Sequence, residues 1–234
     1  MHRSESEQPE PAAEVFFENK LARSFFARDP ATVARELLGK YLIRKTRPQD
    51  RGGSTCVVVG GRIVETEAYL ASGDPASHSF RGETRRNRSM FAAAGTLYVY
   101  TIHAKYCLNV STERAGIGSA VLIRAIEPLW GLAQMRAARG QTDLRRLTRG
   151  PAMICQALGV TLAEDGIDLI DSDDFLIGAG QRDVISGSDE FAAGVCAPAA
   201  GPRVGISRGR ELPLRYCAPG NRYVSGAVVR GNAV

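Results

Sequence analysis

The stretch Arg62-Ile63-Val64-Glu65-Thr66-Glu67-Ala68-Tyr69 combines β-branched and aromatic residues with two glutamates at alternate positions. Such residues favour strands, so the stretch predicts a β-strand. Successive side chains of a strand point to opposite faces, and we therefore expect Ile63, Glu65, Glu67 and Tyr69 to share one face. Two carboxylates placed side by side repel each other unless a cation or water lies next to them. The pair has two interpretations: a general base whose pKa a neighbouring charge raises, or a structural strand face paired with arginines.

Segments on the N-terminal side of this strand predict a helix and further strands. Asp29-Pro30 has the pattern of an N-cap followed by a first-turn proline, and Gly39 ends the apolar face of the predicted helix. Strands are predicted around residues 41–43 and 56–59, with a polar loop around residues 51–53 between them and a bulge or bend at Gly60-Gly61. After Tyr69, a loop of roughly 20 residues extends to about Met90, and a loop of that length is usually functional.

Segments on the C-terminal side predict a β-hairpin and two helices. Residues 95–100 and 106–111 form the hairpin, with His103, Ala104 and Lys105 at its tip. The other predicted elements are a strand over 120–125, helices over 128–139 and over 151–158 with Gly159 as the stop, and short strands over 203–206 and 223–225. Hairpins mixed with separate helices indicate an α+β fold (mixed α/β) in a single domain.

Length and composition are those of an ordinary globular protein. The 234 residues, with 44% hydrophobic and 24% charged residues, fit one domain, which we place at residues 16–234. Residues 1–15 are polar and acidic and lack the apolar core of a presequence, so we expect a disordered tail and a cytoplasmic protein. No apolar run is long enough for a membrane helix. Five scattered cysteines without a CxxC motif, and only three histidines, favour reduced thiols and no metal.

The formal net charge of +5 is carried almost entirely by arginine. Only four of the 30 basic residues are lysines, which leaves 26 arginines. Arginine binds phosphate and stacks on bases, so the excess suggests a nucleic-acid surface. Codon bias in a GC-rich genome explains the same number, and composition alone favours codon bias.

Several further residues are candidates for a site, each with a simpler structural explanation. His78 follows the glutamate strand in its loop and is either a base or stacking group or an ordinary hydrogen-bonded residue. The hairpin aromatics Tyr98 and Tyr100 either pack across strands or accompany a tip that enters a DNA groove. Asn109 lies in mid-strand and Arg124 at a strand end, where each needs a specific partner. The loop also carries a basic run, which either binds phosphate or is merely solvated: Arg81, Arg85, Arg86 and Arg88.

Taken together, these blocks resemble the alkyladenine (3-methyladenine) DNA glycosylase family. The resemblance rests on the strand at 62–69 with His78 eleven residues after Glu67, on Arg86-Asn87-Arg88-Ser89-Met90-Phe91 and Gly95-Thr96-Leu97-Tyr98-Val99-Tyr100, and on Val121-Leu122-Ile123-Arg124-Ala125-Ile126-Glu127-Pro128-Leu129. It extends to Gly150-Pro151, Pro202-Arg203-Val204-Gly205 and Pro213-Leu214-Arg215-Tyr216 and covers roughly residues 20–228.

The resemblance implies a fold, an activity and a set of site residues. The family fold is one mixed α/β domain with a curved antiparallel sheet, and the family needs no metal or organic cofactor. Glu67 resembles the general base that activates water, and Arg124 resembles the residue that positions it. Three residues resemble the walls between which a flipped base stacks: Tyr69, His78 and Tyr100. Asn109 resembles the residue that rejects guanine through its 2-amino group.

The chain departs from the family pattern at its expected DNA contacts. The family wedge is usually a tyrosine, whereas the aligned residue here is His103, with Ile102 and Lys105 as alternatives. Arg149 precedes Gly150-Pro151, where the family usually has a small polar residue, so a phosphate contact is expected to have moved to Arg149. Arg203 is a further candidate phosphate contact.

The implied function is a monofunctional DNA glycosylase that flips damaged purines from double-stranded DNA and hydrolyses the N-glycosidic bond. The implied lesions are 3-methyladenine and 7-methylguanine, with hypoxanthine and ethenoadenine as further substrates. We expect a monomer, because one domain engages one lesion. Two other classes fit less well: a lesion-binding module without chemistry, which has no use for Glu67, and a nucleoside hydrolase, which has no use for the hairpin tip.

Overall fold

The computed structural model describes residues 19–46, 56–179 and 197–226. The helices are α2 (Arg23–Phe26), α3 (Pro30–Glu36), α5 (Leu132–Arg139), α6 (Leu144–Leu147) and α7 (Pro151–Leu158), with the 3-10 helices η1 (Arg88–Phe91) and η2 (Leu162–Glu164). The strands are β1 (Tyr41–Thr46), β2 (Val57–Tyr69), β3 (Leu97–Ile102), β4 (Lys105–Ser111), β5 (Ala120–Trp130), β6 (Phe175–Gly178), β7 (Ala199–Gly201) and β8 (Arg215–Cys217).

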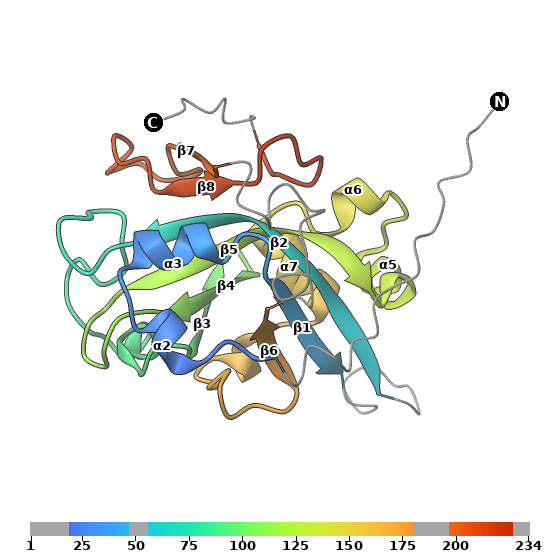
Figure 1. The fold of residues 1–234 in the computed structure, drawn as a ribbon, viewed down its shortest axis with the longest axis horizontal. Helices are drawn as coiled ribbons and strands as arrows, with labels where there is room; N and C mark the ends of the chain where they lie inside the picture. Colours follow the sequence, from blue (N-terminus) through green and yellow to red (C-terminus); the bar gives the residue numbers. More distant parts are fainter. Residues whose placement is uncertain (1–18, 47–55, 180–196, 227–234) are drawn as a thin grey trace.

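One antiparallel sheet organises these elements. Its main path runs β3-β4-β5-β2-β1-β6, and β8 joins it by pairing with β2 and β7. The curved sheet crosses the molecule, with the short β7 and β8 along one side of it and α2 and α3 on another (Figure 1). The fold is therefore mixed α+β with a curved antiparallel sheet and a β3–β4 hairpin, as the sequence and the family resemblance predicted.

The strand β2 is the centre of the sheet because it pairs with three others. Residues 57–62 pair with β1, residues 65–67 pair with β8, and β5 runs along the opposite side. The register against β5 shifts at Gly60/Gly61, which confirms the predicted bulge. A Cβ on Gly61 would lie 1.9 Å from the carbonyl oxygen of Glu127, so only glycine lets the two strands approach this closely.

Two predicted helices form with the expected ends. The Asp29 side chain caps α3 by accepting a hydrogen bond from the Thr32 N–H at 2.8 Å, and Pro30 is its first residue. The helix α7 begins at Pro151 and ends at Gly159, whose φ of 71° is the left-handed conformation of a C-cap. The predicted disordered tail and the polar loop around 51–53 lie outside the described residues.

Other predictions need correction. The helix predicted from Pro128 starts only at Leu132, because β5 continues to Trp130, whose ring packs against Tyr41 at 5.6 Å. No strand forms over 203–206 or 223–225. The backbone N–H groups of Val204 and Ser225 donate instead to the carboxylates of Glu67 and Glu65. These N–H groups are therefore not available for hydrogen bonds to a neighbouring strand.

The alternation predicted for β2 is also broken. A register shift between Ile63 and Glu65 removes Ile63 from the glutamate face, and Ile63 lies in the main hydrophobic core. That core joins the sheet to α3 and α7. Its largest fully buried side chains include Phe26, Leu37, Leu42, Leu97, Leu108, Ile123 and Ile126.

The hairpin tip is tighter than predicted. A two-residue turn of His103 and Ala104, with φ values of 46° and 58°, joins the strands, and Lys105 already belongs to β4 opposite Ile102. Positive φ at both central residues is typical of the turn whose twist matches a β-hairpin. Because side chains alternate, Tyr98, Tyr100 and Ile102 share one face of β3. None of the described helices is long and apolar enough to cross a membrane.

Candidate active site

A pocket of about 780 Å³ opens where β2, β3, β4 and β5 meet the C-terminal segment, residues 197–226. Seven residues singled out in the sequence line it, besides Ile102 of the hairpin: Tyr69, His78, Arg81, Tyr98, Tyr100, Asn109 and Arg124. The pocket also receives Ile102 from the hairpin and Val204 to Arg208 from the C-terminal segment. Segments that are distant in the sequence therefore meet at one cavity, which is typical of a ligand site.

Glu67 lies directly behind the wall of this pocket. It is fully buried, and one oxygen, Oε1, accepts a hydrogen bond from the Val204 N–H at 2.7 Å. The other, Oε2, accepts from the Tyr69 hydroxyl at 3.0 Å and lies 3.2 Å from Nη1 of Arg124. Burial raises the pKa of Glu67, while Arg124 and the two hydrogen bonds oppose that rise. All three partners of Glu67 line the pocket, so one layer of residues separates the carboxylate from the cavity.

Glu65 has a different environment from its neighbour on the strand. Its carboxylate accepts hydrogen bonds from Nε of Arg124 at 3.0 Å and Nε of Arg215 at 2.8 Å. Ser225 donates to it through its N–H at 2.6 Å and its hydroxyl at 3.0 Å. Glu65 is fully buried and is not among the residues that line the pocket. Its donors make it an anchor for the C-terminal segment and for Arg124.

The positive charge of Arg124 offsets the repulsion between the carboxylates of Glu65 and Glu67. Its guanidinium contacts Glu65 through Nε and Glu67 through Nη1, and only 8% of its side chain is exposed. Nη2 lies 3.4 Å from the Ser225 hydroxyl. The planar guanidinium fixes both carboxylates at once, which lysine cannot do. The cation expected beside the glutamate pair is thus Arg124, with Arg215 as a second cation that the sequence reading did not identify.

Aromatic side chains form the walls of the pocket. The rings of His78 and Tyr100 meet edge-on with centroids 4.5 Å apart, and Nδ1 of His78 is 2.8 Å from the Tyr98 hydroxyl. Burial lowers the pKa of His78, which favours a neutral imidazole. Because His78 and Tyr100 touch each other, they form a single wall. Tyr69 also lines the pocket and comes from a different strand.

The sheet register sets the floor of the pocket. Glu67 pairs with Leu122, Leu122 pairs with Asn109, and Asn109 pairs with Tyr98, so these residues form one row across four strands. The amide nitrogen of Asn109 donates to the Tyr98 carbonyl at 3.0 Å, which fixes the orientation of the side chain. The partner that a mid-strand asparagine requires is therefore the backbone of the next strand.

The predicted DNA contacts are exposed side chains, and one of them lines the pocket. The side chains of Arg81, Arg85, Arg86 and Arg88 are exposed, as are His103 and Lys105 at the hairpin end, and only Arg81 of this set lines the cavity. Arg149 is exposed, and its Nε donates to the Val224 carbonyl at 2.7 Å.

Arg203 is not available to bind a DNA phosphate, so its prediction as a phosphate contact is corrected. Its side chain is fully buried and makes a two-pronged ion pair with Asp74, with both N–O distances 2.6 Å. The guanidinium carbon lies 4.6 Å from the centre of the Tyr69 ring, and Nη1 also donates to the Ala68 carbonyl at 2.9 Å. Arg203 thus holds the end of β2 and the back of the Tyr69 ring in place.

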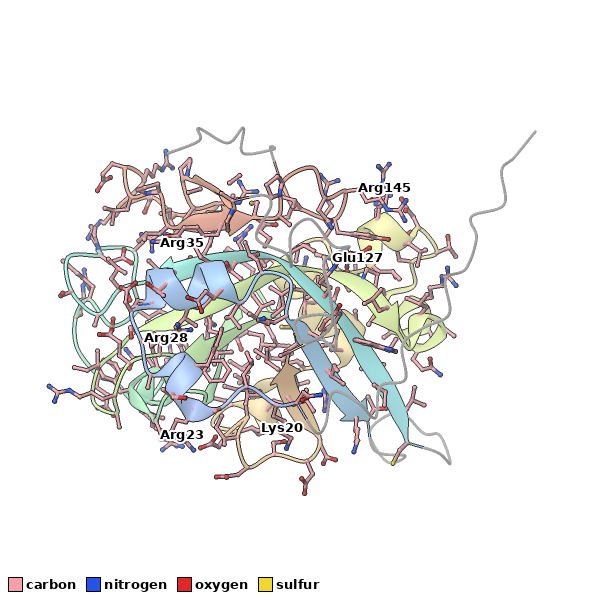
Figure 2. The ribbon with its side chains drawn as sticks, in the orientation of Figure 1. Lys20, Arg23, Arg28, Arg35, Glu127 and Arg145 are labelled. Atoms are coloured by element: carbon pink, nitrogen blue, oxygen red, sulfur yellow. The ribbon has the colours of Figure 1, made fainter. Side chains whose placement is uncertain are left out.

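Other arginines have structural partners at the surface. Arg23 pairs with Asp168 and Arg28 with Glu36, both at 2.8 Å, and Arg35 lies over the ring of Tyr216 at 5.3 Å. Figure 2 labels these three arginines on and beside α2 and α3. They belong to local packing, so the arginine excess is only partly explained by a DNA surface.

The sequence reading missed the site residues that come from the C-terminal segment and from the loop after β2. Val204, Arg215 and Ser225 bind the glutamates across separations of 137 to 160 residues, which no local spacing can reveal. Asp74 and Arg203 are likewise 129 residues apart. The available signal was the resemblance of the blocks around Arg203 and Arg215 to the family, which identified the segments without giving their contacts.

Similarity to known proteins defines the class of this protein. A family model described as methylpurine-DNA glycosylase (MPG) matches residues 24–222, and the chain belongs to this family. The predicted family is confirmed, and so is the predicted enzyme class: a DNA glycosylase, a hydrolase of base excision repair that acts on damaged DNA.

The names of curated relatives agree with this family. A protein of Rhodopirellula baltica named "Putative 3-methyladenine DNA glycosylase" is 48% identical over 213 residues, which are 89% of this chain and 84% of that protein. A protein of the same name from Burkholderia cenocepacia is 44% identical over 98% of this chain and its own full length. One from Methanoculleus marisnigri is 43% identical over 88% of this chain and 98% of that protein.

Proposed function

We propose that this protein is a monofunctional glycosylase that removes alkylated or deaminated purines from duplex DNA, with Glu67 as the general base. The proposed substrates are 3-methyladenine and 7-methylguanine, followed by hypoxanthine and ethenoadenine. The observation that carries the proposal is the buried Glu67 carboxylate, held by Arg124 immediately behind a pocket with aromatic walls. The family membership and the names of the relatives support the substrate class.

The chemical step needs a water molecule and a flipped nucleotide. A base cannot be attacked inside the stack, so the nucleotide must rotate into the pocket. The water oxygen forms a bond to C1′, Glu67 accepts the proton of that water, and the C1′–N bond breaks with its electron pair passing to the base. A cationic alkylated purine leaves as a neutral molecule. Arg124 is a positioning residue, because it contacts Oε2 of Glu67 and lines the same pocket.

The aromatic walls suit a flipped purine, and a cationic one most of all. We propose that the base stacks between Tyr69 on one side and the His78–Tyr100 wall on the other. Cation–π attraction of about 1–2 kcal/mol per desolvated ring would favour methylated purines over normal ones. Asn109, fixed by the Tyr98 carbonyl, is proposed to clash with the 2-amino group of normal guanine at the pocket floor. 7-Methylguanine carries the same group, and we propose that its cationic ring and weakened glycosidic bond offset the clash.

The duplex is proposed to contact the exposed cations around the pocket. Arg81, Arg85, Arg86 and Arg88 are proposed phosphate contacts, and Arg149 a further one beside the C-terminal segment. The hairpin end is the proposed wedge, with His103 at the turn and Lys105 beside it. Ile102 is the member of this tip that also lines the pocket.

Release of the base is proposed to leave the DNA strand intact. Strand cleavage by a glycosylase uses an amine that attacks C1′, and none of the described residues that line the pocket is a lysine. The product is then an abasic site. We propose a monomer as the active form, because one domain engages one lesion.

A panel of damaged duplexes tests the function. The protein is incubated with oligonucleotide duplexes that carry 3-methyladenine, 7-methylguanine, ethenoadenine or hypoxanthine, and with an undamaged duplex as the control. We expect free base and alkali-labile abasic sites from the methylated duplexes and no strand break before alkali. Binding without release from any duplex would instead support a lesion-binding module and would refute the enzymatic proposal.

A further inference from the structure

Exposed apolar side chains gather at the pocket. Four large hydrophobic side chains are exposed among the described residues: Phe80 at 51%, Ile102 at 47%, Leu162 at 53% and Val204 at 39%. Phe80, Ile102 and Val204 all line the pocket, whereas Leu162 does not. They come from the loop after β2, from the hairpin and from the C-terminal segment. Exposed apolar groups concentrated around one opening indicate a surface that a partner covers.

Hydrogen bonds within its loop hold Phe80 in an exposed position. The buried Ser77 and Ser79 both precede it in the chain and pair through their hydroxyls at 2.8 Å. The Phe80 N–H donates to the Ser77 carbonyl at 3.2 Å, and the Asn87 amide donates to the His78 carbonyl at 2.9 Å. These bonds fix the backbone before Phe80, and the Gly82 N–H, which donates to the Ser79 carbonyl at 2.8 Å, fixes it after Phe80, so the ring is exposed on an ordered loop.

The charge around Phe80 favours a nucleic acid as the covering partner. Arg81 follows it in the chain and lines the pocket, and Arg208 lines the pocket from the C-terminal segment. Both Arg81 and Arg208 are exposed. Apolar side chains bordered by unburied cations suit a partner that has phosphates outside and stacked bases inside. An apolar protein surface would leave these cations without counter-charges.

We propose that Phe80 is a second DNA-inserting side chain, which packs against the base or sugar next to the flipped nucleotide. The hairpin end is the proposed wedge, and the loop after β2 supplies Phe80 from a separate element. The opening left by a flipped base has faces that lose their stacking partners, and an aromatic ring restores part of that contact. This inference rests on the proposed function, because it assigns Phe80 to the same lesion complex.

The test compares two substitutions of equally exposed residues. Phe80→Ala removes the proposed contact, and Leu162→Ala is the matched control because Leu162 is exposed away from the pocket. Binding is measured to a duplex with a tetrahydrofuran abasic analogue and to the undamaged duplex of the same sequence. We expect Phe80→Ala to weaken binding to the abasic duplex at least about fivefold, the lower end of base–aromatic stacking. Binding to the undamaged duplex and its salt dependence should stay as in the wild type, and Phe80→Trp should restore the affinity.

Any of three other results would overturn the inference. Equal binding by Phe80→Ala and Leu162→Ala would show that the ring makes no lesion-specific contact. Equal weakening on both duplexes, with a shallower salt dependence, would make the loop a backbone contact. A change in sedimentation with Phe80→Ala would assign the ring to self-association. Failure of the proposed function is separate, because it would appear as absent base release by the wild type on the damaged panel.

Discussion

Replacing Glu67 with glutamine is expected to reduce base release under single-turnover conditions at least about 100-fold, the scale of a lost general base. Glutamine keeps the shape and can still accept a hydrogen bond from the Val204 N–H, but it cannot accept the proton of the attacking water. Lesion binding is expected to remain, because the aromatic walls and the DNA contacts are unchanged. The measurement pairs the rate of 7-methylguanine release with the affinity for the same duplex.

Glu127→Gln is the matched control for this substitution. Glu127 also lies on a central strand, but its partner is Arg62, at 2.6 Å, and it is not part of the pocket lining. The same chemical change there should leave base release within about twofold of the wild type. Near-normal release by Glu67→Gln would move the general base elsewhere, with Glu65 as the first alternative.

Replacing Arg203 with methionine is expected to cost about 3–5 kcal/mol of unfolding free energy, the usual result of breaking a buried ion pair. The substitution would leave the carboxylate of Asp74 buried without its cation, although the N–H groups of Leu70 and Ala76 still donate to it. For a chain of this size the loss corresponds to a fall in Tm of very roughly 10 °C. Thermal unfolding followed by circular dichroism measures it.

Arg28→Met is the control for the ion pair. Arg28 pairs with Glu36 at 2.8 Å, but the side chains are 35% and 48% exposed, so its removal should cost no more than about 1 kcal/mol. Adding Asp74→Leu to Arg203→Met should recover part of the lost stability, because no unpaired charge then remains. Equal Tm values for the Arg203 and Arg28 variants would refute the structural role assigned to Arg203.

Local sequence patterns predicted those parts of the fold that local chemistry determines. The N-cap of α3, the glycine stop of α7 and the bulge at Gly60-Gly61 each depend on a few adjacent residues, and each forms as expected. The helix start at Pro128 was wrong because proline is compatible with a bulged strand as well as with a first helical turn. Tertiary pairing of β5 with β2 decided between the two.

The candidate site was predictable in its residue types and only partly in its geometry. Alternation placed Glu65, Glu67 and Tyr69 together, and the family resemblance supplied His78, Tyr100, Asn109 and Arg124. The separation of roles between the two glutamates could not be predicted, because it depends on Arg215, Val204 and Ser225 from the far end of the chain. Arg203 was assigned wrongly because an arginine in an ion pair and one at a phosphate look alike in sequence.

The pH dependence of 7-methylguanine release tests the central assignment most directly. This cationic base needs no protonation to leave, so the single-turnover rate should follow the fraction of Glu67 that is ionised. Burial raises the pKa of Glu67 above 4.5, and the rate should therefore rise with pH through that raised pKa and then level off. The rising limb should be absent in Glu67→Gln. A rate that does not change with pH in the wild type, or a limb that survives in Glu67→Gln, would contradict the assignment of Glu67 as the general base.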